Sequence, residues 1–165
     1  MTPKILIAGI GNIFLGDDAF GVEVARRLAQ SEVPKGVTVT DFGVRSYDLA
    51  FALMNEWDLS ILVDALPRGG KPGTIYVLEP ELPEGELNQD ALDAHSMNPV
   101  AVLQLVQALG GKVGRLLVVG CEPATIAPNL DGNLGLSPPV QGAMDEAVRV
   151  IEGLISTATR RGMAA

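Results

Sequence analysis

The sequence predicts an α/β fold with three layers (α/β/α), in which helices cover both faces of a mostly parallel five-stranded sheet. Short apolar runs of the kind that form buried parallel strands recur along the chain. Segments with helical spacing of apolar residues alternate with them, as in βαβ units. A chain of 165 residues, 47% of them hydrophobic, can bury one sizeable core. We therefore expect a single domain over residues 1–157 and a frayed polar tail over residues 158–165.

The predicted strands are apolar runs bounded by glycine, proline or acidic residues. They cover Ile5–Ile10, Val37–Phe42, Leu59–Val63, Thr74–Leu78 and Leu116–Val119. The fourth run follows the Gly/Pro-rich connection Pro67–Gly73, whose length and chemistry suit a turn. This pattern predicts that Thr74–Leu78 is an antiparallel edge strand.

Four helices are predicted between and after these strands. The first places Phe20, Val24 and Leu28 on one face, and two others cover Tyr47–Asn55 and Pro99–Leu109. The last begins at Ser137-Pro138, with serine as the cap and proline in the first turn. Its expected buried face consists of Val140, Met144, Val148 and Ile151. Residues 79–93 and 122–136 are predicted loops, and loops of the second length are usually functional or mobile.

Two acids near the ends of predicted strands are the first candidate functional residues. Asp18 follows the first strand through the turn Gly9–Asn12, and Asp64 directly ends the third strand. If the second and third strands lie on opposite sides of the first, the carboxyl ends of the first and third strands flank the switch point of the sheet. Asp18 and Asp64 then lie close together. A carboxylate at the end of a buried strand, such as that of Asp64, is costly to bury unless it is paired, bound to a ligand or hydrogen-bonded to loop amides.

The glycines of this N-terminal stretch match neither common phosphate-binding pattern. A dinucleotide fingerprint requires glycine where Phe14 stands, and a phosphate-cradling loop requires Lys and Ser or Thr where Asp17 and Asp18 stand. These acids suit a cation better than a phosphate. A nucleotide remains an alternative because Asp41 ends the second strand, where a ribose-binding acid could lie. A structural alternative is that Asp17 caps the helix and Asp18 complements its dipole.

His95, the single histidine, completes a candidate metal-binding set with the two acids. Asp18, Asp64 and His95 would supply two oxygen donors and one nitrogen donor, which suits a divalent first-row metal such as nickel or zinc. A lone histidine is more often structural, so this alternative stays open. Cys121 also ends a strand at this edge. It is either part of a cysteine–histidine nucleophile or a small buried thiol.

Charge and cysteine content narrow the expected partners. The formal net charge of −8 argues against nucleic acid or an anionic membrane as a partner. No segment approaches the length of a membrane span. The single cysteine allows no internal disulfide, which fits a reducing compartment, and we expect a cytoplasmic location.

Several short motifs together resemble the hydrogenase maturation endopeptidases, which trim the large subunit of nickel–iron hydrogenases. The matching segments are Gly9-Ile10-Gly11-Asn12, Gly16-Asp17-Asp18 with Gly21, Leu62-Val63-Asp64-Ala65, Pro72-Gly73-Thr74, Ala94-His95, Glu122-Pro123 and Gly135-Leu136-Ser137-Pro138. Each motif is weak alone, but their order and spacing are specific and cover nearly the whole chain.

The resemblance implies a cytoplasmic endopeptidase that removes a C-terminal peptide from a nickel-loaded large-subunit precursor. It implies that Asp18, Asp64 and His95 contact the metal and carry the reaction. The nickel would come with the substrate, and the isolated protein could instead hold another divalent metal. Whether a carboxylate or a metal activates the water is left open.

One segment departs from the family pattern. Within the segment Asp41–Ser46, Asp41 and Gly43 match a family loop that is associated with the choice of substrate, which implies a substrate-binding role, whereas the other positions do not match it. The particular hydrogenase partner is therefore open. The alternative to an endopeptidase is a non-catalytic metal-binding or chaperone module that docks on a nickel protein.

Overall fold

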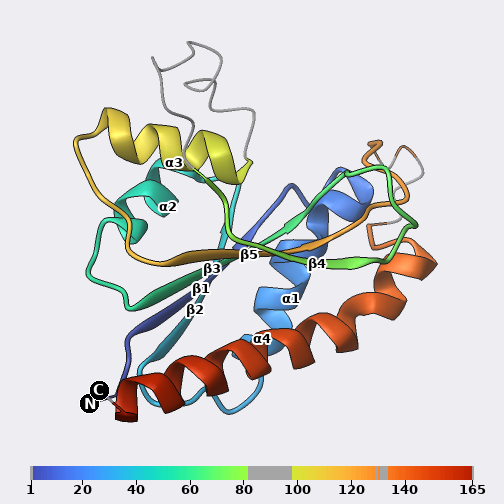
Figure 1. The fold of residues 1–165 in the computed structure, drawn as a ribbon. Coiled ribbons are helices and arrows are strands. Elements are labelled where there is room, and N and C mark those ends of the chain that lie inside the picture. Colours follow the sequence, from blue (N-terminus) through green and yellow to red (C-terminus); the bar gives the residue numbers. More distant parts are fainter. Residues whose placement is uncertain (1, 82–97, 129, 131–133, 165) are drawn as a thin grey trace.

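One five-stranded sheet with helices on both faces forms the centre of the protein (Figure 1). The computed structural model describes residues 2–81, 98–128, 130 and 134–164. The strands are β1 (Ile5–Ile10), β2 (Val37–Gly43), β3 (Leu59–Ala65), β4 (Ile75–Leu78) and β5 (Leu116–Cys121). The helices are η1 (Gly16–Ala19), α1 (Phe20–Ala29), α2 (Ser46–Leu53), α3 (Pro99–Ala108) and α4 (Pro138–Ala164). The alternation of strands and helices confirms the predicted α/β class.

The strand order is β2-β1-β3-β5-β4, and the chain reverses direction across the sheet at β1. Strands β2, β1, β3 and β5 pair in parallel, whereas β4 pairs antiparallel with β5 at the edge. The predicted antiparallel edge strand is therefore confirmed. Because β2 and β3 lie on opposite sides of β1, the carboxyl ends of β1 and β3 flank the switch point, where open α/β sheets form their crevice.

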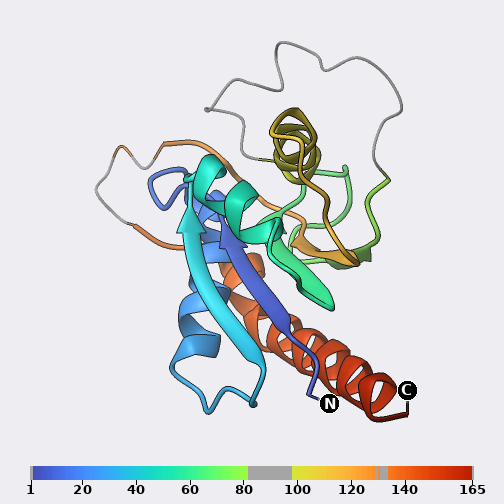
Figure 2. The ribbon, with the colours of Figure 1, turned by 90° about the vertical axis from the view of Figure 1, so that its left-hand side faces the viewer.

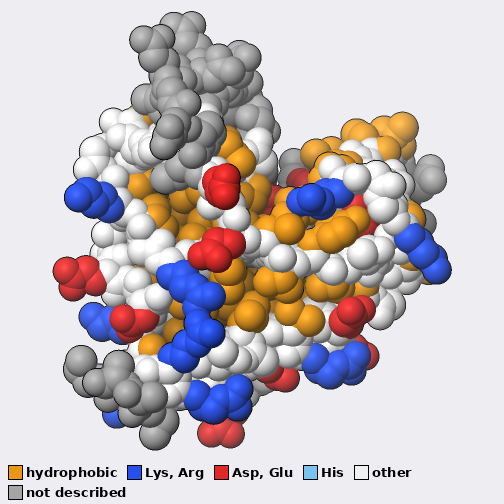
Figure 3. Space-filling model, viewed as in Figure 1, with side chains coloured by type: hydrophobic (Ala, Val, Ile, Leu, Met, Phe, Trp, Pro, Cys, Tyr) orange, Lys and Arg blue, Asp and Glu red, His pale blue; other side chains and the backbone are white. Residues whose placement is uncertain are grey.

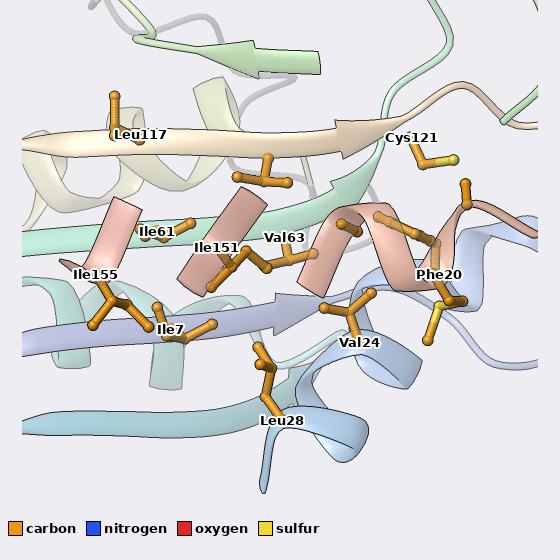
Figure 4. Close-up of a cluster of buried hydrophobic side chains, with 14 of the residues drawn as sticks. Ile7, Phe20, Val24, Leu28, Ile61, Val63, Leu117, Cys121, Ile151 and Ile155 are labelled. Atoms are coloured by element: carbon orange, nitrogen blue, oxygen red, sulfur yellow. The ribbon is translucent and has the colours of Figure 1, made fainter. Parts of the chain in front are cut away.

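Helices α1 and α4 cover one face of the sheet, and α2 and α3 cover the other (Figure 2). The first face buries one cluster of apolar side chains that includes Ile7, Phe20, Val63 and Ile151 (Figure 4). The second face buries a separate cluster that includes Leu49 and Val106. Strands β1 and β3 are buried along their whole length, as their near-continuous apolar sequences predict.

Strands β3 and β5 extend further than the apolar runs indicate. Asp64 pairs with Gly120 and Ala65 pairs with Cys121, so the parallel ladder continues two residues beyond Val63 and Val119. Asp64 is consequently the second-to-last residue of β3 and is buried there.

Helix α4 continues to Ala164, so the segment from residue 158, for which we predicted a frayed tail, is helical up to that residue. Ala158 packs against the core cluster beneath α4. The Thr159 hydroxyl donates a hydrogen bond of 2.9 Å to the Ile155 carbonyl oxygen within the helix. Packing of the amphipathic face therefore sustains the helix through a segment whose composition favours fraying.

Two further expectations concern loops and membrane spans. Between residues 122 and 136, those that the structure describes contain no helix or strand, in agreement with a predicted loop. Most of the predicted loop 79–93 lies outside the described residues. In the part of the chain that the structure describes, no helix combines the length and the apolar character that a membrane crossing requires.

Candidate active site

Glycines in the first βα unit allow its backbone segments to approach closely beside the switch point. A Cβ atom on Gly11, which has a φ of 143°, would overlap the Asp18 carbonyl oxygen. A Cβ atom on Gly21 would overlap the carbonyl oxygens of Val63 and Ile10. The glycine pattern therefore serves close packing rather than phosphate binding. It brings the turn that carries Asp18 against the end of β3, where Asp64 lies.

Asp18 lies on η1, half-buried at the mouth of this crevice. Its Oδ2 accepts a hydrogen bond of 2.8 Å from the backbone N–H of Asn12. Burial raises the pKa of Asp18 above its ordinary value of 3.8, and the hydrogen bond from Asn12 offsets only part of that effect. The structure thus keeps this carboxylate in place without fully stabilising its charge.

Asp64 lies at the end of β3 and is only 3% exposed. Burial raises its pKa well above 3.8, and the negative charge of Asp18 raises it further, whereas the hydrogen bond from the Ala65 amide lowers it in part. Asp18 and Asp64 thus lie at the same switch point, the first on η1 after β1 and the second at the end of β3, and the charge of Asp18 adds to the effect of burial on the pKa of Asp64. Two such groups favour either a shared proton or a bound cation, which relieves the repulsion between their charges.

The third predicted ligand, His95, lies outside the described residues. Among residues 2–81, 98–128, 130 and 134–164, no group of three His, Cys, Asp or Glu side chains could hold a metal ion. Of the three predicted ligands, Asp18 on η1 and Asp64 at the end of β3 lie at the switch point. Their oxygen donors and unrelieved charge fit a divalent cation.

Asp41 and Gly43 border a groove that adjoins the acid pair. The groove has a volume of about 530 Å³ and extends from Gly11 and Asn12 to the loop after β2. The Gly11 amide donates to the Gly43 carbonyl oxygen at 3.0 Å, which joins that loop to the turn beneath Asp18. The Asp41 carboxylate pairs with Arg26 at 3.4 Å, so in this structure it bonds to a protein side chain.

Exposed hydrophobic side chains surround the same edge of the sheet. Phe14 and Val44 beside the groove are 62% and 52% exposed, and Ile126 and Leu134 on the β5–α4 connection are 38% and 59% exposed. Figure 3 shows hydrophobic side chains gathered over this connection, at the upper right of the view. Apolar surface of this kind beside a crevice is typical of a protein-binding site.

Cys121 is a core residue and lies among the buried side chains of the α1–α4 face (Figure 4). It is fully buried, and its thiol faces the Glu122 carbonyl oxygen at 3.7 Å. Burial, together with the charge of Asp17, raises the pKa of Cys121 to about 12. A protonated, inaccessible thiol does not act as a nucleophile, which favours the packing hypothesis over the cysteine–histidine one.

Two buried acids beside this crevice have roles that the sequence pattern did not predict. Asp17 is fully buried and does not cap a helix; its carboxylate accepts hydrogen bonds from Ala124, Thr125 and Ser137. Ser137 stands at the predicted N-cap position, because α4 begins at Pro138 and the Ser137 carbonyl oxygen accepts from the Gln141 amide, but its hydroxyl donates to Asp17. The alternative that Asp17 is structural rather than catalytic is correct, but through long-range bonds instead of a cap.

Glu122 holds the loop that follows β3. Its carboxylate accepts hydrogen bonds from the amides of Arg68 and Gly69 at 2.8 and 3.0 Å, and from the Tyr76 hydroxyl at 2.9 Å. Burial alone would raise the pKa of Glu122, but these donors outweigh it and lower the pKa below 4.5. The motif Glu122-Pro123 was the one sequence signal that pointed to this residue.

The fold and this acid pair define a carboxylate site at the switch point of an open α/β sheet, without a serine or cysteine nucleophile among the groups described above. Comparison with known proteins identifies the family to which the chain belongs. The family model described as "Hydrogenase maturation protease" matches residues 22–154. The chain belongs to this family of endopeptidases.

Individual relatives and structures agree with this assignment. The chain is 34% identical to the coenzyme F420 hydrogenase subunit delta of Methanothermobacter thermautotrophicus, over 90% of this chain and 92% of that protein. It is 29% identical to the hydrogenase 2 maturation protease of Escherichia coli K12, over 90% and 88%. The structure of the hydrogenase maturating endopeptidase HybD from E. coli superposes with a TM-score of 0.72 at 25% identity, covering 94% of this chain and 93% of that one. Membership of a peptidase family favours the enzymatic prediction over a non-catalytic module.

Proposed function

We propose that this protein is a nickel-dependent processing endopeptidase that removes the C-terminal peptide from the large-subunit precursor of a nickel–iron hydrogenase in the cytoplasm. The family and the names of its relatives support a hydrogenase as the partner. The observation that carries the proposal is the pair of carboxylates at the switch point: Asp18 and Asp64 are both partly or fully buried, and both have raised pKa values. This arrangement is costly for the free protein and favourable once a cation is present.

Nickel in this proposal belongs to the substrate. Asp18 and Asp64 would bind it through oxygen, and His95 would add a nitrogen donor, as the family resemblance implies. Three protein donors leave the coordination shell incomplete, so the isolated protein should bind nickel or another divalent ion only weakly. The positive charge would relieve the repulsion that raises the pKa of Asp64.

The reaction is hydrolysis of one peptide bond. A water oxygen attacks the scissile carbonyl carbon and gives a proton to a carboxylate, which passes it to the leaving amine nitrogen. We assign the proton transfer to this pair of carboxylates, Asp18 and Asp64, because burial raises the pKa of both. Bound nickel would supply additional charge stabilisation at this site.

The groove beside Asp41 and Gly43 is the proposed binding site for the precursor. The groove starts at Gly11 and Asn12, and the Asn12 amide donates a hydrogen bond to Asp18. Val44 and Arg45, which depart from the family pattern, also line it. A hydrophobic wall with an arginine would select a precursor segment of complementary chemistry, which makes this groove the expected determinant of the hydrogenase partner.

The decisive experiment compares cleavage of precursor produced with and without nickel. We expect mass spectrometry to show a shortened large subunit only from the nickel-loaded form, and His95→Ala to reduce cleavage of that form. Asp145→Asn, which changes an acid 64% exposed on α4, is the matched control and should cleave normally. Equal cleavage of the two precursor forms would contradict nickel dependence and indicate a protease that reads peptide sequence alone.

A further inference from the structure

The carboxylate of Asp17 joins three segments that are distant in sequence. Its Oδ2 accepts hydrogen bonds from the amides of Ala124 and Thr125 at 2.8 and 3.1 Å and from the Ser137 hydroxyl at 2.8 Å. Its Oδ1 accepts from the Ser137 amide at 2.7 Å. These partners lie 107 to 120 residues along the chain. One side chain therefore ties η1 to both ends of the β5–α4 connection.

The backbone beside Asp17 strengthens the same junction. The Asp17 amide donates to the Thr125 carbonyl oxygen at 2.9 Å. Gly16 has a φ of 56°, and a Cβ atom there would approach the Thr125 carbonyl oxygen to 3.0 Å. The η1 turn is thus held against the segment after β5 by main-chain and side-chain bonds together.

Asp18 is the next residue on this turn, and its own restraints are few. Its amide donates to the Leu15 carbonyl oxygen at 3.1 Å, and its carboxylate accepts the single described bond from Asn12. Both Asp18 and Asp64 carry a negative charge when ionised, and repulsion between them favours movement of the more exposed group away from the crevice. A separate restraint must hold the turn in place.

We propose that Asp17 is a positioning residue for the peptidase reaction: by clamping η1 to Ala124, Thr125 and Ser137, it holds Asp18 beside Asp64. Asp17 acts through Asp18 and is itself too deeply buried to touch the substrate. The kinetic part of this inference rests on the proposed function, whereas its structural part can be tested without any substrate.

The requirement is for a carboxylate rather than a polar side chain of the same size. All four described hydrogen bonds of the side chain are accepted by its oxygens, and three of the donors are backbone amides that cannot reorient. An asparagine that keeps its oxygen toward Ala124 and Thr125 would turn its NH2 group toward the Ser137 amide. Asp17→Asn therefore preserves volume while replacing one hydrogen bond by a donor–donor contact.

The test compares Asp17→Asn with two matched variants. Ser137→Ala removes only the hydroxyl donor and keeps the three amide bonds. Ile155→Val removes one methyl group from the core. Ile155 lies on α4, far along the helix from Ser137, so this variant is a control for general loss of stability. All three are measured at a temperature where thermal unfolding shows them to be fully folded.

For cleavage of the loaded precursor, we expect Asp17→Asn to lower kcat by about 10- to 100-fold with a much smaller change in KM, since small displacements of catalytic groups have effects of this size. Ser137→Ala should show a smaller loss, and Ile155→Val should retain the wild-type kcat. An unchanged kcat in folded Asp17→Asn would overturn the inference. An equal loss in Ile155→Val at the same thermal shift would overturn it too.

Hydrogen exchange of the Asn12 amide gives a readout that needs no activity. This amide donates to Asp18 Oδ2, so its protection reports directly on the position of Asp18. Asp17→Asn should accelerate its exchange about 10-fold or more relative to the core amides of β1, whereas Ile155→Val should not. Wild-type protein that fails to cleave any precursor would refute the proposed function alone, whereas unchanged Asn12 protection in Asp17→Asn would refute the positioning role alone.

Discussion

Asp17 and Asp18 are neighbours in the chain and have opposite surroundings. Asp17 is fully buried, and its two oxygens accept four hydrogen bonds. Asp18 is half-buried, accepts one described hydrogen bond and adds to the effect of burial in raising the pKa of Asp64. The difference teaches that the supply of donors, rather than burial, separates a structural acid from one that is available for chemistry.

The ends of two adjacent strands repeat this contrast. Glu122 directly follows β5 and is surrounded by donors that lower its pKa, whereas Asp64 near the end of β3 is similarly buried and has a raised pKa. Asp17 and Glu122, whose oxygens accept several hydrogen bonds, hold loops in place. Asp18 and Asp64, whose oxygens accept few described hydrogen bonds, remain able to take up a proton or a cation.

The largest expected effect is the loss of cleavage in Asp64→Asn. The amide keeps the shape of the side chain but cannot accept a proton from water, so we expect kcat to fall by about 100- to 10,000-fold. Thermal unfolding at neutral pH should show no loss of stability, because the ionised carboxylate is the costly form in this crevice. Unfolding of the variant under assay conditions would contradict our separation of structural from functional acids.

The next largest expected effect is a difference in the free energy of unfolding between variants of the two neighbouring acids, Asp17 and Asp18. Asp17→Ala leaves the amides of three part-buried hydrogen bonds without their acceptor and should lower the free energy of unfolding by about 3–5 kcal/mol. Asp18→Ala removes one described acceptor from a half-buried site and should cost less than about 1.5 kcal/mol. Urea unfolding of both variants measures the difference. Equal losses would mean that the hydrogen bonds of Asp17 add no stability.

The pH dependence of stability should have opposite signs for Glu122 and Asp64. The pKa of Glu122 is lowered on folding, so its contribution is present above its ordinary value of 4.5 and is lost as the pH falls through the folded-state pKa. The pKa of Asp64 is raised, so its contribution is complete below 3.8 and is lost as the pH rises through the folded-state pKa.

Denaturant unfolding of wild type, Glu122→Gln and Asp64→Asn between about pH 3 and pH 7 tests these signs. As the pH is lowered, the advantage of wild type over Glu122→Gln should shrink, whereas wild type should gain relative to Asp64→Asn. Parallel pH profiles for the two variants would contradict the comparison.

The smallest expected effect on activity is that of Cys121→Ala. Cys121 is fully buried in the core, and its pKa of about 12 keeps the thiol protonated. We expect cleavage close to the wild-type rate and a loss of about 1–2 kcal/mol in the free energy of unfolding from the small cavity. Complete loss of cleavage in a folded variant would revive the cysteine–histidine hypothesis.

The sequence by itself determined the fold class, the parallel pairing of the central strands and the placement of Asp18 and Asp64 after neighbouring strands. These features depend on local information: apolar runs specify buried strands, glycines permit the close approach of β1 and α1, and the topology of a parallel sheet places strand ends at one edge. The apolar spacing of the last helix likewise predicted its buried residues Val140, Met144 and Ile151.

Only the tertiary structure decided the extent of β3, the length of α4 and the roles of Asp17 and Glu122. Each depends on partners that the local pattern does not contain: the ladder from β5 extends β3, core packing sustains α4, and the donors around Asp17 come from residues 107 to 120 positions away. An acid before a helix has the same local sequence whether it caps that helix or bonds to a distant loop. The donors that the rest of the chain brings to its oxygens decide which of the two occurs.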